Sequence, residues 1–82
     1  PVKLAQYGDG RLVSRSQAKR LLVRCNRFET VILDFKDVKS IGQAFADEIF
    51  RVFSNQYPEV SLEATNAAFA VESMIKRAKS HK

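Results

Sequence analysis

The chain has 82 residues and a net charge of +5 at pH 7, with 45% hydrophobic and 28% charged residues. This length holds one small domain, and the composition is typical of a globular chain rather than a disordered one. Its longest apolar run, residues 67–71, is too short for a membrane-spanning helix, which needs ~20 apolar residues. The single cysteine, Cys25, excludes an internal disulfide, and with one histidine it also excludes a Cys/His zinc site.

We expect one domain over residues 1–82, with a frayed tail at residues 80–82. The chain begins at Pro1 rather than at a methionine, which fits either a removed initiator or a piece of a longer protein. Because a lone cysteine is kept reduced most simply in the cytoplasm, we expect a cytoplasmic protein with no membrane association. The charge is unevenly distributed, since both ends of the chain are basic and its middle is acidic.

The first third of the chain predicts a strand, a turn and a basic helix. Residues 2–6 alternate between apolar and polar, which favours a short strand, and the glycines of residues 8–10 favour a turn before a short return strand at 11–13. Ser14 or Ser16 then caps a helix. Spacings of three and four residues define its apolar stripe, which consists of Ala18, Leu21, Leu22, Cys25 and Phe28.

The middle of the chain predicts a central strand and a second helix. Residues 30–35 are β-branched and almost continuously apolar, which is typical of a central strand covered on both faces. After a loop at 36–41, residues 42–57 predict a helix, and Phe45 is interpreted as a core residue at the edge of its stripe. That stripe consists of Ala46, Ile49, Phe50, Phe53 and Tyr57.

The last third predicts a third strand at 60–64 and a third helix that begins after Asn66. The apolar stripe of this helix consists of Val71, Met74, Ile75 and Ala78. Alternation of strands and helices with short connections predicts an α/β fold: a small mixed or parallel sheet of three to four strands with three helices.

Basic residues crowd the first helix, and an arginine-rich helix can contact nucleic-acid phosphates. These residues are Arg15, Lys19, Arg20, Arg24 and Arg27. The helix has no aromatic partners on its polar face and lies in no helix-turn-helix pattern, so a nucleic-acid-associated domain is the alternative function. A solvated helix face is the simplest interpretation of these charges.

Nothing in the sequence indicates an enzyme, so we expect a protein that is not catalytic and binds no cofactor or metal. The glycines of residues 8–10 are too closely spaced for a dinucleotide loop, and no Walker lysine motif is present. His81 lies in the tail, where it is poorly placed to act as a general base. Asp47 and Glu48 are neighbours on a helix, so their side chains point ~100° apart and would need further ligands to hold a metal.

The junction between the central strand and the second helix is the candidate binding site. In an open α/β sheet the carboxyl end of a strand and the start of the next helix meet at the surface, where ligands and partners bind. We therefore expect a partner protein to contact Ser40, Gly42, Gln43, Asp47 and Glu48. The competing interpretation is that the two acidic residues only stabilise the helix start and pair with Arg51.

The same stretch carries a family resemblance. Leu33-Asp34-Phe35 followed by Val38 and Ile41 resembles the strand–loop–helix pattern of STAS domains, the anti-sigma-factor-antagonist fold. With Phe45-Ala46-Asp47-Glu48, the match is closer to a STAS-like bacterial family of unknown function, whose helix entry also resembles residues 12–18. The resemblance covers about residues 10–78.

This resemblance implies a small sheet with packed helices and a regulatory, non-catalytic role in binding a protein, such as a histidine-kinase-like ATP-binding protein. In STAS antagonists a serine at the helix start is phosphorylated. Here that position reads Gly42-Gln43-Ala44-Phe45, which carries no hydroxyl group, so phosphorylation is excluded at this spot. Ser40 lies just upstream and is the substitute that a phosphate switch would use.

Overall fold

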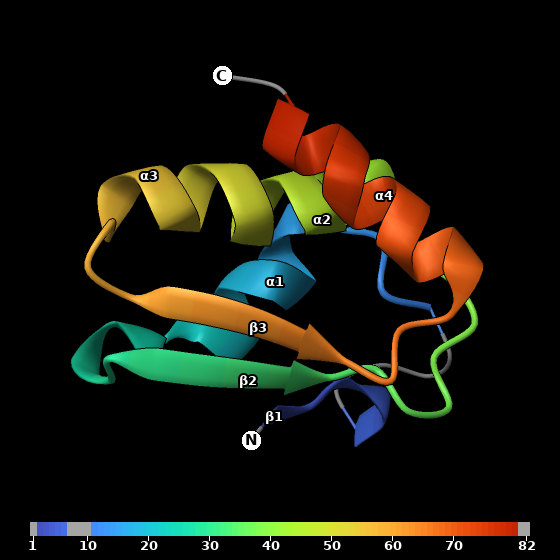
Figure 1. The fold of residues 1–82 in the computed structure, drawn as a ribbon, viewed down its shortest axis with the longest axis horizontal. Coiled ribbons are helices and arrows are strands. Elements are labelled where there is room, and N and C mark those ends of the chain that lie inside the picture. The colour runs from blue at the N-terminus through green and yellow to red at the C-terminus, as the bar shows by residue number, and fades with distance from the viewer. Residues whose placement is uncertain (1, 7–10, 81–82) are drawn as a thin grey trace.

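The computed structural model describes residues 2–6 and 11–80 as a parallel sheet with helices packed against it (Figure 1). The sheet has three strands in the order β1-β2-β3: Val2–Lys3, Thr30–Asp34 and Ser61–Thr65. Leu33 of β2 pairs with Val2 on one side and with Ala64 on the other. The sheet is therefore parallel throughout, and the predicted α/β architecture is confirmed.

The first strand and its return strand are shorter than the sequence predicts. β1 ends at Lys3, and residues Leu4–Gln6 form a turn of 3-10 helix, η1. Of the expected return strand, Leu12 alone forms a bridge, which is parallel to Ile41. The predicted turn at residues 8–10 lies outside the described residues.

Helix α1 spans Arg15–Leu22, and Ser14, the first of the two predicted caps, is its N-cap. The Gln17 backbone N–H donates to Ser14 Oγ at 3.2 Å, and the Ser14 N–H donates to Gln17 Oε1 at 2.9 Å. This reciprocal pair is a capping box, which satisfies two backbone donors at the helix start.

The apolar stripe of α1 is buried only in part. Cys25 is buried as expected, and burial raises the pKa of its thiol. Phe28, which the helical spacing places in the core, is 59% exposed, so that prediction is wrong. The reason is that α1 ends at Leu22 and residues Cys25–Arg27 form a 3-10 turn, η2, whose tighter winding shifts the phase of the stripe.

The predicted second helix is continuous but winds in three ways. Residues Gln43–Asp47 form α2, Glu48–Phe53 form a π-helical segment, η3, and Ser54–Gln56 form α3. The predicted stripe packs inward, and Phe45 is fully buried. The last helix, α4, spans Phe69–Ser80, so Ser80 is helical, whereas the rest of the predicted frayed tail lies outside the described residues.

Strand β3 begins and ends one residue later than predicted, and Asn66 does not directly precede α4. Asn66 has a φ of 55°, and its side-chain amide donates to Asp34 Oδ1 at 3.0 Å. It therefore ties the end of β3 to the end of β2 instead of capping α4, which begins at Phe69.

One face of the sheet lies open, contrary to the expectation for β2. Val31 and Leu33 are 5% and 0% exposed, but Ile32, between them, is 37% exposed. Sequential parallel strands joined by right-handed crossovers place every connecting helix on the same side. The helices therefore cover only the face of Val31 and Leu33. The largest fully buried side chains of this single core are Phe35, Phe45, Leu4, Leu33, Ile49 and Val71.

Within the described part of the chain, every helix is too short or too polar to span a membrane.

Candidate functional site

The loop that follows β2 is held in place by backbone hydrogen bonds and buried anchors. The Val38 N–H donates to the Phe35 carbonyl at 3.0 Å, and the Gly42 N–H donates to the Leu12 carbonyl at 2.7 Å. Phe35 and Ile41, at the two ends of the loop, are buried. The exposed loop residues therefore sit on a fixed backbone, since both ends of the loop are attached to the core.

Gly42, the residue before α2, allows a close approach between two segments. A Cβ atom on Gly42 would lie 2.7 Å from Val13 Cα, which is closer than two such atoms can come. Any side chain at this position would therefore push the start of α2 away from residues 12–13. Gly42 acts through packing, and only Ser40 and Gln43 of the predicted contact residues present exposed side chains.

Asp47 lies at the centre of an ion-pair cluster between α1 and the second helix. Its Oδ2 accepts from Arg15 Nη1 at 2.7 Å and from Arg51 Nη2 at 2.7 Å. Arg15 Nη1 also lies 3.5 Å from Glu48 Oε1. The side chains of Asp47 and Glu48 are only 12% and 9% exposed, whereas that of Arg15 is 46% exposed.

These contacts lower the pKa of Asp47 far below its usual range. The main cause is the hydrogen bond from the Arg51 side chain, and the bond from Arg15 acts in the same direction against the opposing effect of burial. Asp47 therefore stays ionised at neutral pH, and its charge holds α1 against the start of the second helix.

The ion-pair cluster corrects the expected exposure of two residues. Asp47 and Glu48 were expected at an exposed contact surface, but they are buried against Arg15 because α1 packs on this side of the helix. Arg15, which the alternative nucleic-acid function would use, pairs with both acids, and its side chain is 46% exposed. The expected pairing of Asp47 with Arg51 is confirmed.

The other basic residues of the first helical region remain exposed. They are Lys19, Arg20, Arg24 and Arg27. No ion pair involves them within residues 2–6 and 11–80. Arg15 differs from these four residues because its charge is paired with Asp47 and Glu48.

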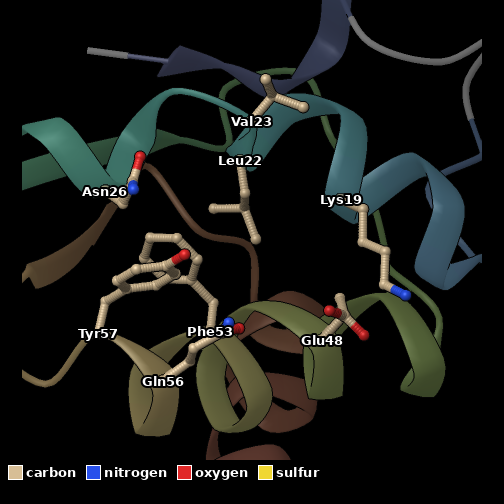
Figure 2. A pocket seen from close by; sticks show the side chains of 8 residues that line it. All are labelled: Lys19, Leu22, Val23, Asn26, Glu48, Phe53, Gln56 and Tyr57. Carbon is tan, nitrogen blue, oxygen red and sulfur yellow. The ribbon is translucent and has the colours of Figure 1, made fainter.

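A groove lies between α1 and the second helix, and the sequence did not predict it. It has a volume of about 230 Å³, and Figure 2 shows Leu22 pointing into it. Lys19 and Glu48 lie at one end, and the rings of Phe53 and Tyr57 lie at the other, with their centroids 5.0 Å apart (Figure 2). The spacing of Phe53 and Tyr57 already indicated one helix face, but not which helix would oppose it.

The described residues thus form an ion-pair cluster and a neighbouring groove between α1 and the second helix. Within the described segments, no three His, Cys, Asp or Glu side chains gather in a way that could hold a metal ion. A search of curated proteins found no match, and a search of solved structures found none either. A family model, described as a STAS-like domain of unknown function, matches residues 17–72. This match covers most of α1, the central strand, the second helix, β3 and the start of α4, and the chain therefore belongs to the family of STAS-like domains of unknown function.

Proposed function

We propose that this domain is a non-catalytic regulatory module that binds a partner protein through the loop and helix start at residues 36–48. The observation that carries the proposal is the combination of exposed side chains and anchored loop ends there. Ser40 and Gln43 are exposed. The buried residues Phe35 and Ile41 anchor the two ends of the loop that precedes Gln43. A surface that is already ordered loses less conformational entropy when it binds, so more of its contact energy appears as affinity.

The ion-pair cluster also holds this surface in place, because it joins α1 to the second helix. Asp47 links Arg15 of α1 to Arg51 of the second helix, so the helix start cannot shift without breaking charged hydrogen bonds. In this proposal Asp47 and Glu48 position the surface, and Ser40 and Gln43 contact the partner. The partner class is the one that the family resemblance implies, a histidine-kinase-like ATP-binding protein, and the helix start offers no serine for its phosphorylation.

Gln43→Arg is expected to weaken partner binding about tenfold or more, because it places a bulky charge in the contact surface. A photo-crosslinking residue at position 43 would first capture the partner in cells, and titration calorimetry would then measure the affinity. Gln43 is exposed, so the free energy of unfolding should change by less than about 0.5 kcal/mol.

The matched control is Gln56→Arg. Gln56 is also an exposed glutamine, and it lies near the other end of the same helical stretch, beside the groove. Its replacement should leave the affinity unchanged. If Gln56→Arg weakens binding and Gln43→Arg does not, the partner binds at the groove and the proposed site is wrong.

Binding to nucleic acid is expected to be weak and strongly dependent on salt. With Arg15 engaged by Asp47, the exposed charges provide only sequence-independent attraction to phosphates. Fluorescence anisotropy with a labelled DNA duplex at 150 mM salt (about the physiological ionic strength) should show no sub-micromolar binding. Sub-micromolar binding that disappears in the double variant Arg20→Glu, Arg24→Glu would make nucleic acid the better partner.

A further inference from the structure

The outer edge of β3 is a strand edge without a neighbour among the described residues. The Ser61 N–H donates to the Glu29 carbonyl at 2.7 Å, and the Thr65 carbonyl accepts from the Phe35 N–H at 2.9 Å. Alternate residues of a strand direct their backbone groups to opposite sides. The N–H and C=O groups of Leu62 and Ala64 therefore point away from β2, toward the open edge.

The side chains at this edge are incompletely covered. On the helix-facing side of the sheet, Leu33 of β2 is 0% exposed, whereas Ala64, its paired neighbour on β3, is exposed. Between β3 and α4 lies a cavity of about 400 Å³, lined on its apolar side by Leu62, Ala64 and Ile75. The helical layer therefore leaves uncovered space where one more strand would continue the sheet.

An exposed aromatic ring flanks this cavity. Phe69, the first residue of α4, is 85% exposed, more than any other large hydrophobic residue in the described chain. Spacings of three and four residues place Phe69 on the same helix stripe as Glu72, Lys76 and Lys79, all of which line the cavity. An open strand edge, a cavity with apolar and charged lining residues and an exposed phenylalanine thus occur together.

We propose that the edge of β3 is a docking site for an extended segment of a partner protein, which adds to the sheet as a fourth strand. Such strand addition gains affinity from main-chain hydrogen bonds and specificity from pockets for alternate side chains. Here the backbone groups of Leu62 and Ala64 would pair with the segment, and its apolar residues would enter the cavity beside Ile75.

The charges at the edge favour a partner segment over a second copy of this chain. Glu63 points to the open face of the sheet, together with Ile32, its neighbour on β2. Antiparallel pairing of two β3 strands about their centre would place Glu63 opposite Glu63, and like charges at that position destabilise a strand pair. The segment that fits carries apolar residues facing α4 and a basic residue opposite Glu63.

Apart from the charge of Glu63, the natural edge-protecting devices are also missing from β3. Its sequence, SLEAT, contains no proline and no lysine, and it pairs with β2 over all five residues without a bulge. Unused edges are normally blunted by such features because they invite pairing with other chains. A regular, unblunted edge is what strand addition requires.

The test uses the 82-residue chain and a synthetic seven-residue peptide with valines at alternate positions and a lysine at its centre. Binding is followed by anisotropy of a labelled peptide, and pairing by amide hydrogen exchange of Leu62 and Ala64. We expect saturable binding that slows exchange of these two amides at least tenfold. The same peptide with N-methylated backbone nitrogens cannot pair and should bind at least tenfold more weakly.

Three variants locate the site within the chain. Ala64→Pro removes an outward N–H while leaving the bonds to β2, and it should weaken binding at least tenfold. Glu63→Lys should reverse the binding preference, so that a peptide with a central glutamate binds more tightly than the peptide with a central lysine. This variant tests the site even if Ala64→Pro fails to fold. Phe69→Ala should weaken binding several-fold, whereas Val23→Ala, at an apolar position that is 70% exposed elsewhere, should not.

Several outcomes would overturn the proposal. These are no saturation at millimolar peptide, equal binding of the N-methylated peptide, or binding that leaves the Leu62 and Ala64 amides unprotected. Protection of both amides without peptide, in step with dimer formation, would show that a second copy occupies the edge and would contradict the partner assignment. The edge of β3 shares no residue with the 36–48 surface. If the strand-addition proposal fails, the Gln43→Arg test of the proposed function is therefore unaffected.

Discussion

Replacing Leu33 by alanine is expected to lower the free energy of unfolding by about 2–5 kcal/mol, whereas the same replacement of Ile32 should cost less than about 1 kcal/mol. The two residues are adjacent in β2, but Leu33 is 0% exposed and faces the helices, while Ile32 is 37% exposed on the open face. Small domains are stabilised by only about 5–15 kcal/mol, so Leu33→Ala would remove a large share of the total free energy of unfolding.

Urea denaturation followed by circular dichroism measures both losses, and the two variants serve as controls for each other. A loss for Ile32→Ala that equals the loss for Leu33→Ala would mean that both faces of β2 are covered, as the continuous apolar run suggests. The one-sided arrangement of helices would then be wrong.

Asp47→Asn is expected to destabilise the domain by about 1.5–3 kcal/mol, the range typical of hydrogen bonds to charged groups. The substitution removes the negative charge that Arg15 and Arg51 share, while keeping the size of the side chain. The cost stays below that of a fully buried ion pair because the two arginine side chains are 46% and 33% exposed, and solvent screens their charges.

The same substitution should change how stability depends on pH. The pKa of Asp47 is lower in the folded protein than its value of ~3.9 in an unfolded chain, so the folded state favours the ionised form. This contribution is fully present above about pH 5 and is lost as the pH falls through the unfolded pKa toward the folded pKa. Acid titration of stability should therefore show a shallower decline for Asp47→Asn than for the unmodified chain.

Asp37→Asn provides the control for this titration. Asp37 is exposed, takes part in no ion pair within the described residues, and has a φ of 68°, which asparagine tolerates well. An equal flattening of the acid limb in Asp37→Asn would show that the cluster at Asp47 is not the source of the pH dependence.

The sequence predicted those features that depend on local periodicity. The apolar run at residues 30–35 identified β2, and the spacing of Ile49, Phe50 and Phe53 identified the buried face of the second helix. The two motifs that resemble the STAS-like family were also sufficient to predict the family that residues 17–72 match. In each case neighbouring residues contain the whole signal.

Features that depend on distant partners could not be predicted in this way. Whether Asp47 is exposed depends on Arg15, which lies 32 residues earlier and meets it only after α1 packs on the second helix. The same holds for Asn66, which appeared to be a helix cap but instead donates to Asp34, also 32 residues away. The continuous run in β2 concealed the open face, because Ile32 gave no local sign of its exposure.

The parallel sheet also has a consequence for how quickly the domain can fold. Thr30 pairs with Ser61, about thirty residues later, and the whole second helix lies between them. A parallel pair cannot start from a tight hairpin, so the chain must close a long loop before the first β2–β3 contacts stabilise it. We therefore expect refolding on the slower timescale of mixed α/β domains, between microsecond helical bundles and all-β proteins, despite the short chain.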